Sequence, residues 1–153
     1  MPEIRNMDSS HQKQQGIAAI EMLLVLPVML ILFVGIFEIS RIFIQYTTLN
    51  KAVQSGARYA LVDIYGAQSQ GAISPVSQIQ NVVVYGQKTT GSESQRVLKG
   101  IAVSDVSVDT SSSNHVTVSV QYAYTPVFSK IPFTTKSLAL NLTASASMRR
   151  SGL

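Results

Sequence analysis

The sequence predicts an α+β protein in which one long N-terminal helix, transmembrane at first and amphipathic further on, precedes a small antiparallel sheet of three to four strands. Three observations support this prediction. Residues 17–37 are apolar apart from one charge, apolar residues then recur at spacings of three and four up to residue 64, and apolar and polar residues alternate strictly in two later segments. Helical and strand periods therefore occupy separate parts of the chain.

The apolar run over residues 17–37 is long enough to cross a bilayer. About 20 apolar residues suffice, whereas the apolar core of a secretory signal has about 7 to 15 and a cleavage site directly after it. No such site follows this run. We therefore expect a permanent transmembrane helix over residues 17–44, in which Glu38 and Arg41 form a solvated pair at the interface.

The polar residues 1–16 end in a glycine at the start of the apolar run. Gly16 lacks a Cβ and leaves the following peptide bond unhindered, so residues 1–16 are interpreted as a cytoplasmic leader that a peptidase removes. Cleavage would make Ile17 a positively charged N-terminus. Glu21, four positions later, would pair with such a terminus and so offset a cost of roughly 2.5 to 3.5 kcal/mol for a carboxylate in lipid. The alternative is that Glu21 only snorkels to the membrane edge.

Several residues of the long helix suit close packing. Pro27 lacks an amide hydrogen and is expected to kink or open the span, and Gly35 adds a second soft point. Ala52, Gly56 and Ala60 follow a small-xxx-small spacing that lets another element approach the backbone. We favour packing of this stretch on the sheet of the same domain. A helix–helix contact between subunits is the alternative.

Residues 45–65 are predicted as an amphipathic extension of the helix, and residues 66–153 as an exported α+β domain. A loop is expected over residues 66–78 and a first strand over 81–85. Residues 103–109 and 115–124 should form an antiparallel hairpin, with residues 137–148 as a further strand. The stripe of the extension consists of Ile42, Tyr46, Leu49, Val53, Ala57, Ala60 and Ile64.

Composition argues against several classes of function. The chain has no cysteine and two histidines, and its net charge of +4 is spread along the sequence. It has no metal-ligand or triad spacing, no phosphate-binding loop and no basic stripe with stacking aromatics. We therefore expect no enzyme activity, no cofactor, no metal, no nucleic acid and no small-molecule substrate.

The segment GIAAIEMLLVLPVMLILFVGIFEISRIF, followed by AVQSGARYA, resembles the TadE-like family of minor pilins from tight-adherence (Tad) pilus systems. The pattern includes Gly16, Glu21, Pro27, Gly35, Glu38, Arg41 and the segment 56–58. Family members often have Tyr after the glutamate and a cysteine pair in the exported part, whereas this chain has Met22 and no cysteine. The resemblance implies a pilin-like fold and cleavage by a prepilin peptidase after Gly16.

The resemblance also implies a location and partners. It suggests a single-pass protein of the bacterial cytoplasmic (inner) membrane, with its N-terminus in the cytoplasm and its C-terminal domain outside. Its expected partners are the membrane, the prepilin peptidase, other Tad pilins and the pilus assembly machinery. It would then be a minor pilin or pseudopilin of an adhesive pilus. The alternative is a membrane-anchored accessory or binding module of a secretion apparatus that does not polymerise.

Overall fold

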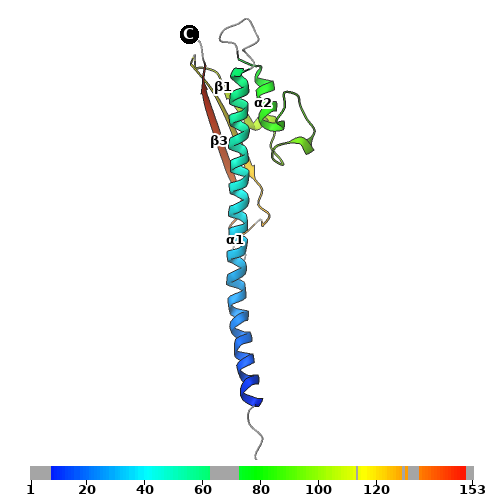
Figure 1. Cartoon of the computed structure of the whole chain (residues 1–153), viewed down its shortest axis with the longest axis vertical. Coiled ribbons are helices and arrows are strands. Elements are labelled where there is room, and N and C mark those ends of the chain that lie inside the picture. The colour runs from blue at the N-terminus through cyan, green and yellow to red at the C-terminus, as the bar shows by residue number, and fades with distance from the viewer. Residues whose placement is uncertain (1–7, 63–72, 113, 129, 131–134, 151–153) are drawn as a thin grey trace, which may run out of the picture.

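In the computed structural model, a single helix runs almost the whole length of the molecule, and the rest of the chain packs beside its C-terminal half (Figure 1). The structure describes residues 8–62, 73–112, 114–128, 130 and 135–150. The long helix α1 spans Asp8–Val62, and a second helix α2 spans Val76–Tyr85. Three strands follow: β1 (Val106–Asp109), β2 (His115–Tyr124) and β3 (Leu140–Arg149). The α+β class is therefore confirmed.

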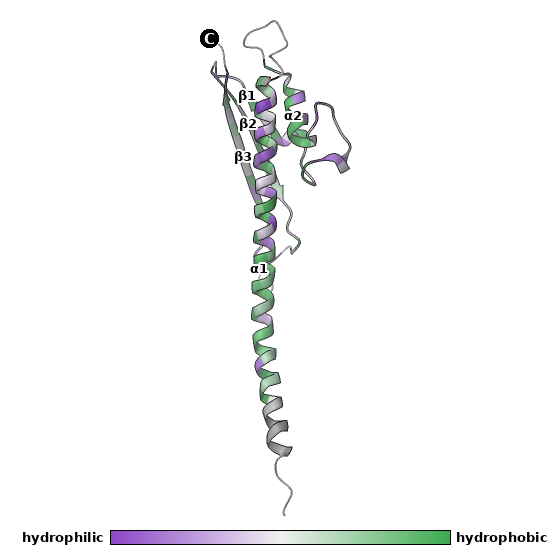
Figure 2. Cartoon of the chain, in the orientation of Figure 1, coloured by the Kyte–Doolittle hydropathy of each residue, from purple (hydrophilic) through white to green (hydrophobic). Residues whose placement is uncertain are grey.

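The two halves of α1 have different surroundings. The part of α1 from Ile17 to Phe37 is apolar apart from Glu21 and mostly exposed, whereas polar residues interrupt the C-terminal half (Figure 2). The C-terminal half buries Leu49, Val53, Ala57 and Ala60, as the stripe predicted. Tyr46 is 42% exposed, so its place in that stripe was wrong, and Ile64 lies outside the described residues. The helix continues through Pro27.

The helix α2 replaces the strand that the sequence predicted over residues 81–85. A short apolar run rich in valine does not distinguish a buried strand from a buried helix by its period. Here Ile79 and Val83 lie one turn apart and both are fully buried, which a helix achieves by packing one face. Gly86 ends the helix with a φ of 69°, and its N–H donates to the carbonyl of Val82 at 3.0 Å.

The close approach of α2 to α1 depends on a glycine. A Cβ added at Gly56 would lie 2.4 Å from Cγ2 of Val83. Ala52 and Ala60 are also buried, on the same side of α1. The small-xxx-small stretch therefore packs within its own domain, as favoured, but its nearest neighbour at Gly56 is α2 rather than the sheet.

The sheet has the order β1-β2-β3, and both pairings are antiparallel. The predicted hairpin is confirmed from residue 106 onward, whereas residues 103–105 form a short 3-10 turn. The predicted third strand is confirmed from residue 140 onward, and it pairs with β2 along its whole length, from His115 opposite Arg149 to Tyr124 opposite Leu140. Both helices lie on one face of this sheet, with α1 against β2 and β3, and α2 against β1.

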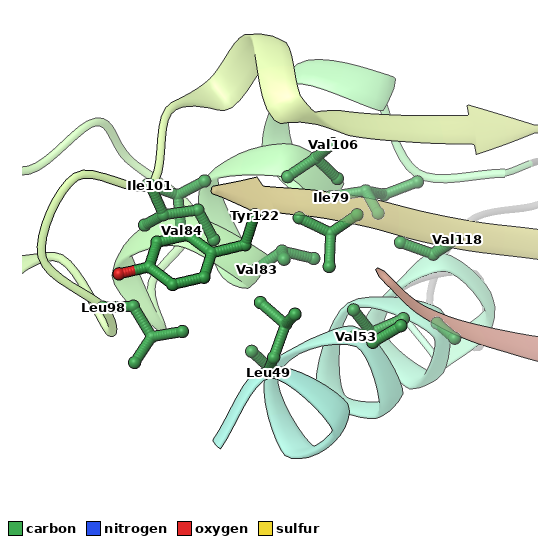
Figure 3. Close-up of a cluster of buried hydrophobic side chains, with 14 of the residues drawn as sticks. Leu49, Val53, Ile79, Val83, Val84, Leu98, Ile101, Val106, Val118 and Tyr122 are labelled. Carbon is green, nitrogen blue, oxygen red and sulfur yellow. The ribbon is translucent and has the colours of Figure 1, made fainter. Parts of the chain in front are cut away.

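One apolar core joins the two helices to the sheet (Figure 3). Leu49 and Val53 of α1 meet Ile79 and Val83 of α2, and Val118 of β2 lies against them. Alternate residues of β2 point into this core, and the residues between them, among them Thr117, Ser119 and Gln121, lie on the other face. The domain is thus built around the C-terminal half of α1, while the N-terminal half remains free of it.

Candidate functional site

The predicted processing segment lies in the exposed half of α1. Gly16, Ile17 and Glu21 are all exposed, and a Cβ added at Gly16 would meet no atom within 4 Å. The helix is continuous from Asp8 through this point. A peptidase acting after Gly16 would therefore have to unwind the helix locally, and a glycine lowers that cost by about 1 kcal/mol relative to alanine.

Glu21 is an isolated carboxylate on an apolar surface. No described residue donates a hydrogen bond to it or forms an ion pair with it. Its neighbours along the helix include the exposed Ile20, Met22 and Leu24. The described residues therefore supply no partner for this charge.

Pro27 and Gly35 also lie in the free half of α1. A Cβ added at Gly35 would meet no atom of the described residues within 4 Å. This position therefore differs from Gly56, where the added atom would clash with α2. The packing role expected of Pro27 and Gly35 stays a prediction.

A second carboxylate, Glu38, is placed quite differently. Its side chain is 2% exposed, although it directly follows the apolar run. The phenol of Tyr124, at the end of β2, donates a hydrogen bond to its Oε2 atom. The backbone N–H groups of Val127 and Phe128 donate to its Oε1 atom at 2.7 and 2.9 Å. Three donors from one short segment thus converge on this carboxylate.

This arrangement explains how a carboxylate can be buried there. An ionised carboxylate out of water is stable only when charged or polar groups satisfy its oxygens. Backbone amides cannot rotate away or ionise, so Val127 and Phe128 are lasting donors to the Glu38 carboxylate. The result is a clamp, composed of Glu38, Tyr124, Val127 and Phe128, that fastens the end of β2 to the middle of α1.

Arg41 belongs to the same cluster through Tyr124. Its guanidinium carbon lies 5.9 Å from the centre of the Tyr124 ring, within reach of a cation–π contact. The expected solvated pair of Glu38 with Arg41 was therefore wrong, because Glu38 is buried and accepts its hydrogen bonds from the segment after β2. Burial, together with the hydrogen bond to Glu38, raises the pKa of Tyr124 to about 12.

The sequence did contain a signal for the clamp. Counting back from Leu49 by helical turns leads to Gln45, Arg41 and then Glu38, so Glu38 lies on the core-facing side of the helix. An acidic residue on such a side needs a partner inside the domain. The partners themselves could not be predicted, because two of the three donors are backbone amides.

Potential metal ligands do not cluster among the described residues. No group of three or more His, Asp or Glu side chains that could hold a metal occurs among them. His115 is exposed at the start of β2. The Ser111 hydroxyl and backbone amide hold the pKa of Asp109 below its usual value, which is the local bonding of a turn.

Comparison with known proteins bears on the helix. Residues 16–58 match the family model described as TadE-like protein. Over this segment, the chain is similar to TadE-like proteins. No curated protein and no solved structure matches the chain. The similarity to this family therefore covers part of the helix α1 and does not extend to the sheet.

The TadE-like segment contains both carboxylates, one in the exposed half of α1 and one buried against the domain. It begins at Gly16, includes the exposed Glu21 and the buried Glu38, and ends two residues after Gly56. Its N-terminal part is a stretch long and apolar enough to cross a membrane, and its C-terminal part forms one wall of the domain core. The segment thus joins an anchor-like half to a scaffold-like half in one helix.

Proposed function

We propose that this TadE-like protein is a pilin-like structural or assembly component of a Tad (type IVb-like) adhesive pilus, processed by a prepilin peptidase after Gly16. The observation that carries the proposal is Glu21, a carboxylate without a described partner on an otherwise apolar helix surface. A charge there costs roughly 2.5 to 3.5 kcal/mol in lipid. Such a cost favours a partner of opposite charge, and a processed N-terminus at Ile17 supplies one.

The pairing gives subunits a way to recognise one another. When the α-amino group of one subunit meets Glu21 of its neighbour, the charge is neutralised only upon assembly. The apolar side chains around Glu21 remain exposed in the single chain, so they are available to pack between neighbouring helices. Glu21 would then set the register of one helix against the next.

In this proposal the chain crosses the cytoplasmic membrane once, with residues 1–16 inside and the α+β domain outside. The domain gathers around the half of α1 beyond Glu38, so it does not hinder insertion of the apolar half. The partners are the membrane, the prepilin peptidase, other Tad pilins and the assembly machinery. The family match over residues 16–58 supports the association with a Tad system.

A second candidate is an anchored accessory module of a secretion apparatus that does not polymerise. It shares the anchor and the domain, but it needs neither cleavage nor the Glu21 pair. The clamp at Glu38 fits this candidate equally well, because it stabilises the domain regardless of assembly. Cleavage after Gly16 therefore distinguishes the pilin-like component from the accessory module.

N-terminal sequencing of the mature protein, purified from a strain that makes the whole pilus system, tests the proposal. We expect Ile17 as the first residue, and Gly16→Ala should lower the processed fraction relative to a Gly35→Ala control. Deletion of the peptidase should leave the chain intact. An unprocessed N-terminus on the membrane-bound chain, together with its absence from sheared pili, would contradict the pilin mechanism and favour the accessory module.

A further inference from the structure

Large apolar side chains are exposed at the end of the domain that lies nearest the apolar half of α1. Outside α1, the described residues include five exposed large hydrophobic side chains, and three of these lie at this end. Val127 is 57% exposed, Phe128 40% and Leu140 39%. Leu140 is paired with Tyr124, and Val127 and Phe128 follow Tyr124 closely, so the three form one patch.

The clamp determines where this patch lies along the helix. The amides of Val127 and Phe128 are 2.7 and 2.9 Å from Oε1 of Glu38, which holds both residues at the level of that side chain. The segment after β2 is also the part of the domain that extends furthest toward the apolar half of α1 (Figure 1). Its depth relative to a membrane therefore follows from the depth of Glu38.

Along α1, Glu38 comes before the point at which the apolar helix surface ends. Ile39, Phe43 and Ile44 are exposed beyond it, and Tyr46, which is half exposed, precedes the polar residues Thr47 and Thr48. A helix from residue 17 to 44 is about 42 Å long, close to the 40–45 Å of a bilayer with its headgroups. Glu38 then lies about 9 Å inside that limit, at six residues of about 1.5 Å each.

A carboxylate at this depth is costly in lipid unless protein groups surround it. The segment after β2 supplies those groups, so it has to enter the interfacial layer together with Glu38. The side chains that it exposes there are valine and phenylalanine, which suit an apolar environment. Exposed to water instead, the same side chains would be an unfavourable patch at the edge of the domain.

We propose that the segment following β2 is a second membrane-contacting element, which places Val127 and Phe128 in the interfacial layer of the leaflet where α1 leaves the bilayer. This inference rests on the proposed membrane anchoring by α1. It adds that the domain is seated on the membrane at a defined height before assembly. The Glu38 clamp is then the device that couples helix depth to domain position.

Tryptophan reporters test the proposal, because the chain has no tryptophan of its own. Phe128→Trp and Val127→Trp would be made in the full chain and reconstituted in phosphatidylcholine vesicles that contain lipids brominated at shallow or deep acyl positions. Leu24→Trp reports on the anchor. Val76→Trp is a matched control, because it lies exposed at the start of α2, outside the clamp.

We expect the reporters at 127 and 128 to show blue-shifted emission and to lose intensity mainly with the shallow bromines. The reporter at 24 should lose intensity with the deep bromines, and the one at 76 only with aqueous acrylamide. If position 24 is quenched but 127 and 128 behave like 76, the inference fails while the anchor stands. If position 24 is not quenched by lipid, the anchor fails as well.

A neighbouring subunit could also cover the patch, and protein density distinguishes this outcome. Shielding of positions 127 and 128 that appears only at a high protein-to-lipid ratio, without quenching by bromolipid, would overturn the proposal in favour of a subunit contact. Resistance to protease at the level of the unsubstituted chain confirms that each variant is folded. Two adjacent reporters keep the test decisive if one substitution disturbs the clamp.

Discussion

The phenol of Tyr124 donates a hydrogen bond to the carboxylate of Glu38, which precedes it by 86 positions in the chain. This bond and the two amide bonds beside it join the end of β2 to the point on α1 where the apolar run ends. The domain is therefore attached to its helix by a polar clamp at one end and by the apolar core around Leu49 and Val53 further along. Four predictions follow from these contacts and from the proposed assembly.

Glu38→Ala should loosen the end of the domain that lies nearest the apolar half of α1. It leaves the Tyr124 hydroxyl and two amides without their acceptor, and hydrogen bonds to a charged group contribute about 1.5 to 3 kcal/mol each. We expect a clearly lower midpoint of thermal unfolding in detergent and faster proteolysis after β2. The unfolding midpoint of Glu38→Gln should lie between those of Glu38→Ala and the unsubstituted chain, because the amide oxygen of glutamine still accepts from a backbone N–H.

Glu93→Ala is the matched control for Glu38→Ala, because its carboxylate is exposed and forms a surface pair with Arg96 at 3.6 Å. Such pairs contribute about 0 to 1 kcal/mol. Equal effects of the Glu38 and Glu93 substitutions would show that the clamp does not stabilise the domain.

Stability should fall at high pH because of Tyr124. Burial and the hydrogen bond to Glu38 raise the pKa of its phenol from 10.0 to about 12. As the pH rises, the unfolded chain therefore loses this proton before the folded one does. The contribution of the Tyr124 phenol to the free energy of unfolding is complete below pH 10 and is lost as the pH rises toward about 12. Thermal unfolding followed across this range measures the decline.

Tyr124→Phe should flatten that decline, at the cost of lower stability at neutral pH. Tyr122→Phe is the comparison: burial also raises the pKa of Tyr122, but its phenol donates to the carbonyl of Lys99 at 2.8 Å and not to Glu38. Phenolate absorbance should show the titration near pH 12 lost in Tyr124→Phe. An unchanged titration in that variant would refute the assignment.

Gly56→Ala should push α2 away from α1. The new Cβ would lie 2.4 Å from Cγ2 of Val83, and overpacking of this kind costs about 1 to 3 kcal/mol. Val83→Ala in the same chain should restore part of the stability by making room. Gly35→Ala, where no atom lies within 4 Å, is the control and should leave the domain's thermal unfolding unchanged.

Glu21→Gln should leave membrane insertion intact and prevent incorporation into pili. The amide is neutral, so it cannot pair with the amino terminus of a neighbouring subunit, and the cost of a charge in lipid also disappears. Membrane fractionation and the yield of the protein in sheared pili measure the two effects. Glu93→Gln serves as a carboxylate control in the α+β domain, and a normal pilus yield in Glu21→Gln would refute the pairing.

Local patterns predicted most of the secondary structure, and the exceptions have physical causes. The long helix, the hairpin up to Tyr124 and the last strand follow from period and length. The helix α2 did not, because Val82, Val83 and Val84 suit a strand locally and become helical only where Gly56 leaves space for them. Tyr46 belongs to the predicted stripe by spacing but stays exposed, because the buried side of α1 continues from Leu49 through Gln45 and Arg41 to Glu38.

The sequence by itself determined the membrane-length apolar helix, the TadE-like pattern beginning at Gly16 and the unusual position of Glu21, because each depends on residues close together in the chain. Only the tertiary structure decided the role of Glu38. Its donors come from a segment nearly ninety positions away, and two of them are backbone amides that every residue except proline possesses. No sequence pattern encodes such a partner, so the same carboxylate that looks like a solvated surface charge becomes the point at which the domain is fastened to its anchor.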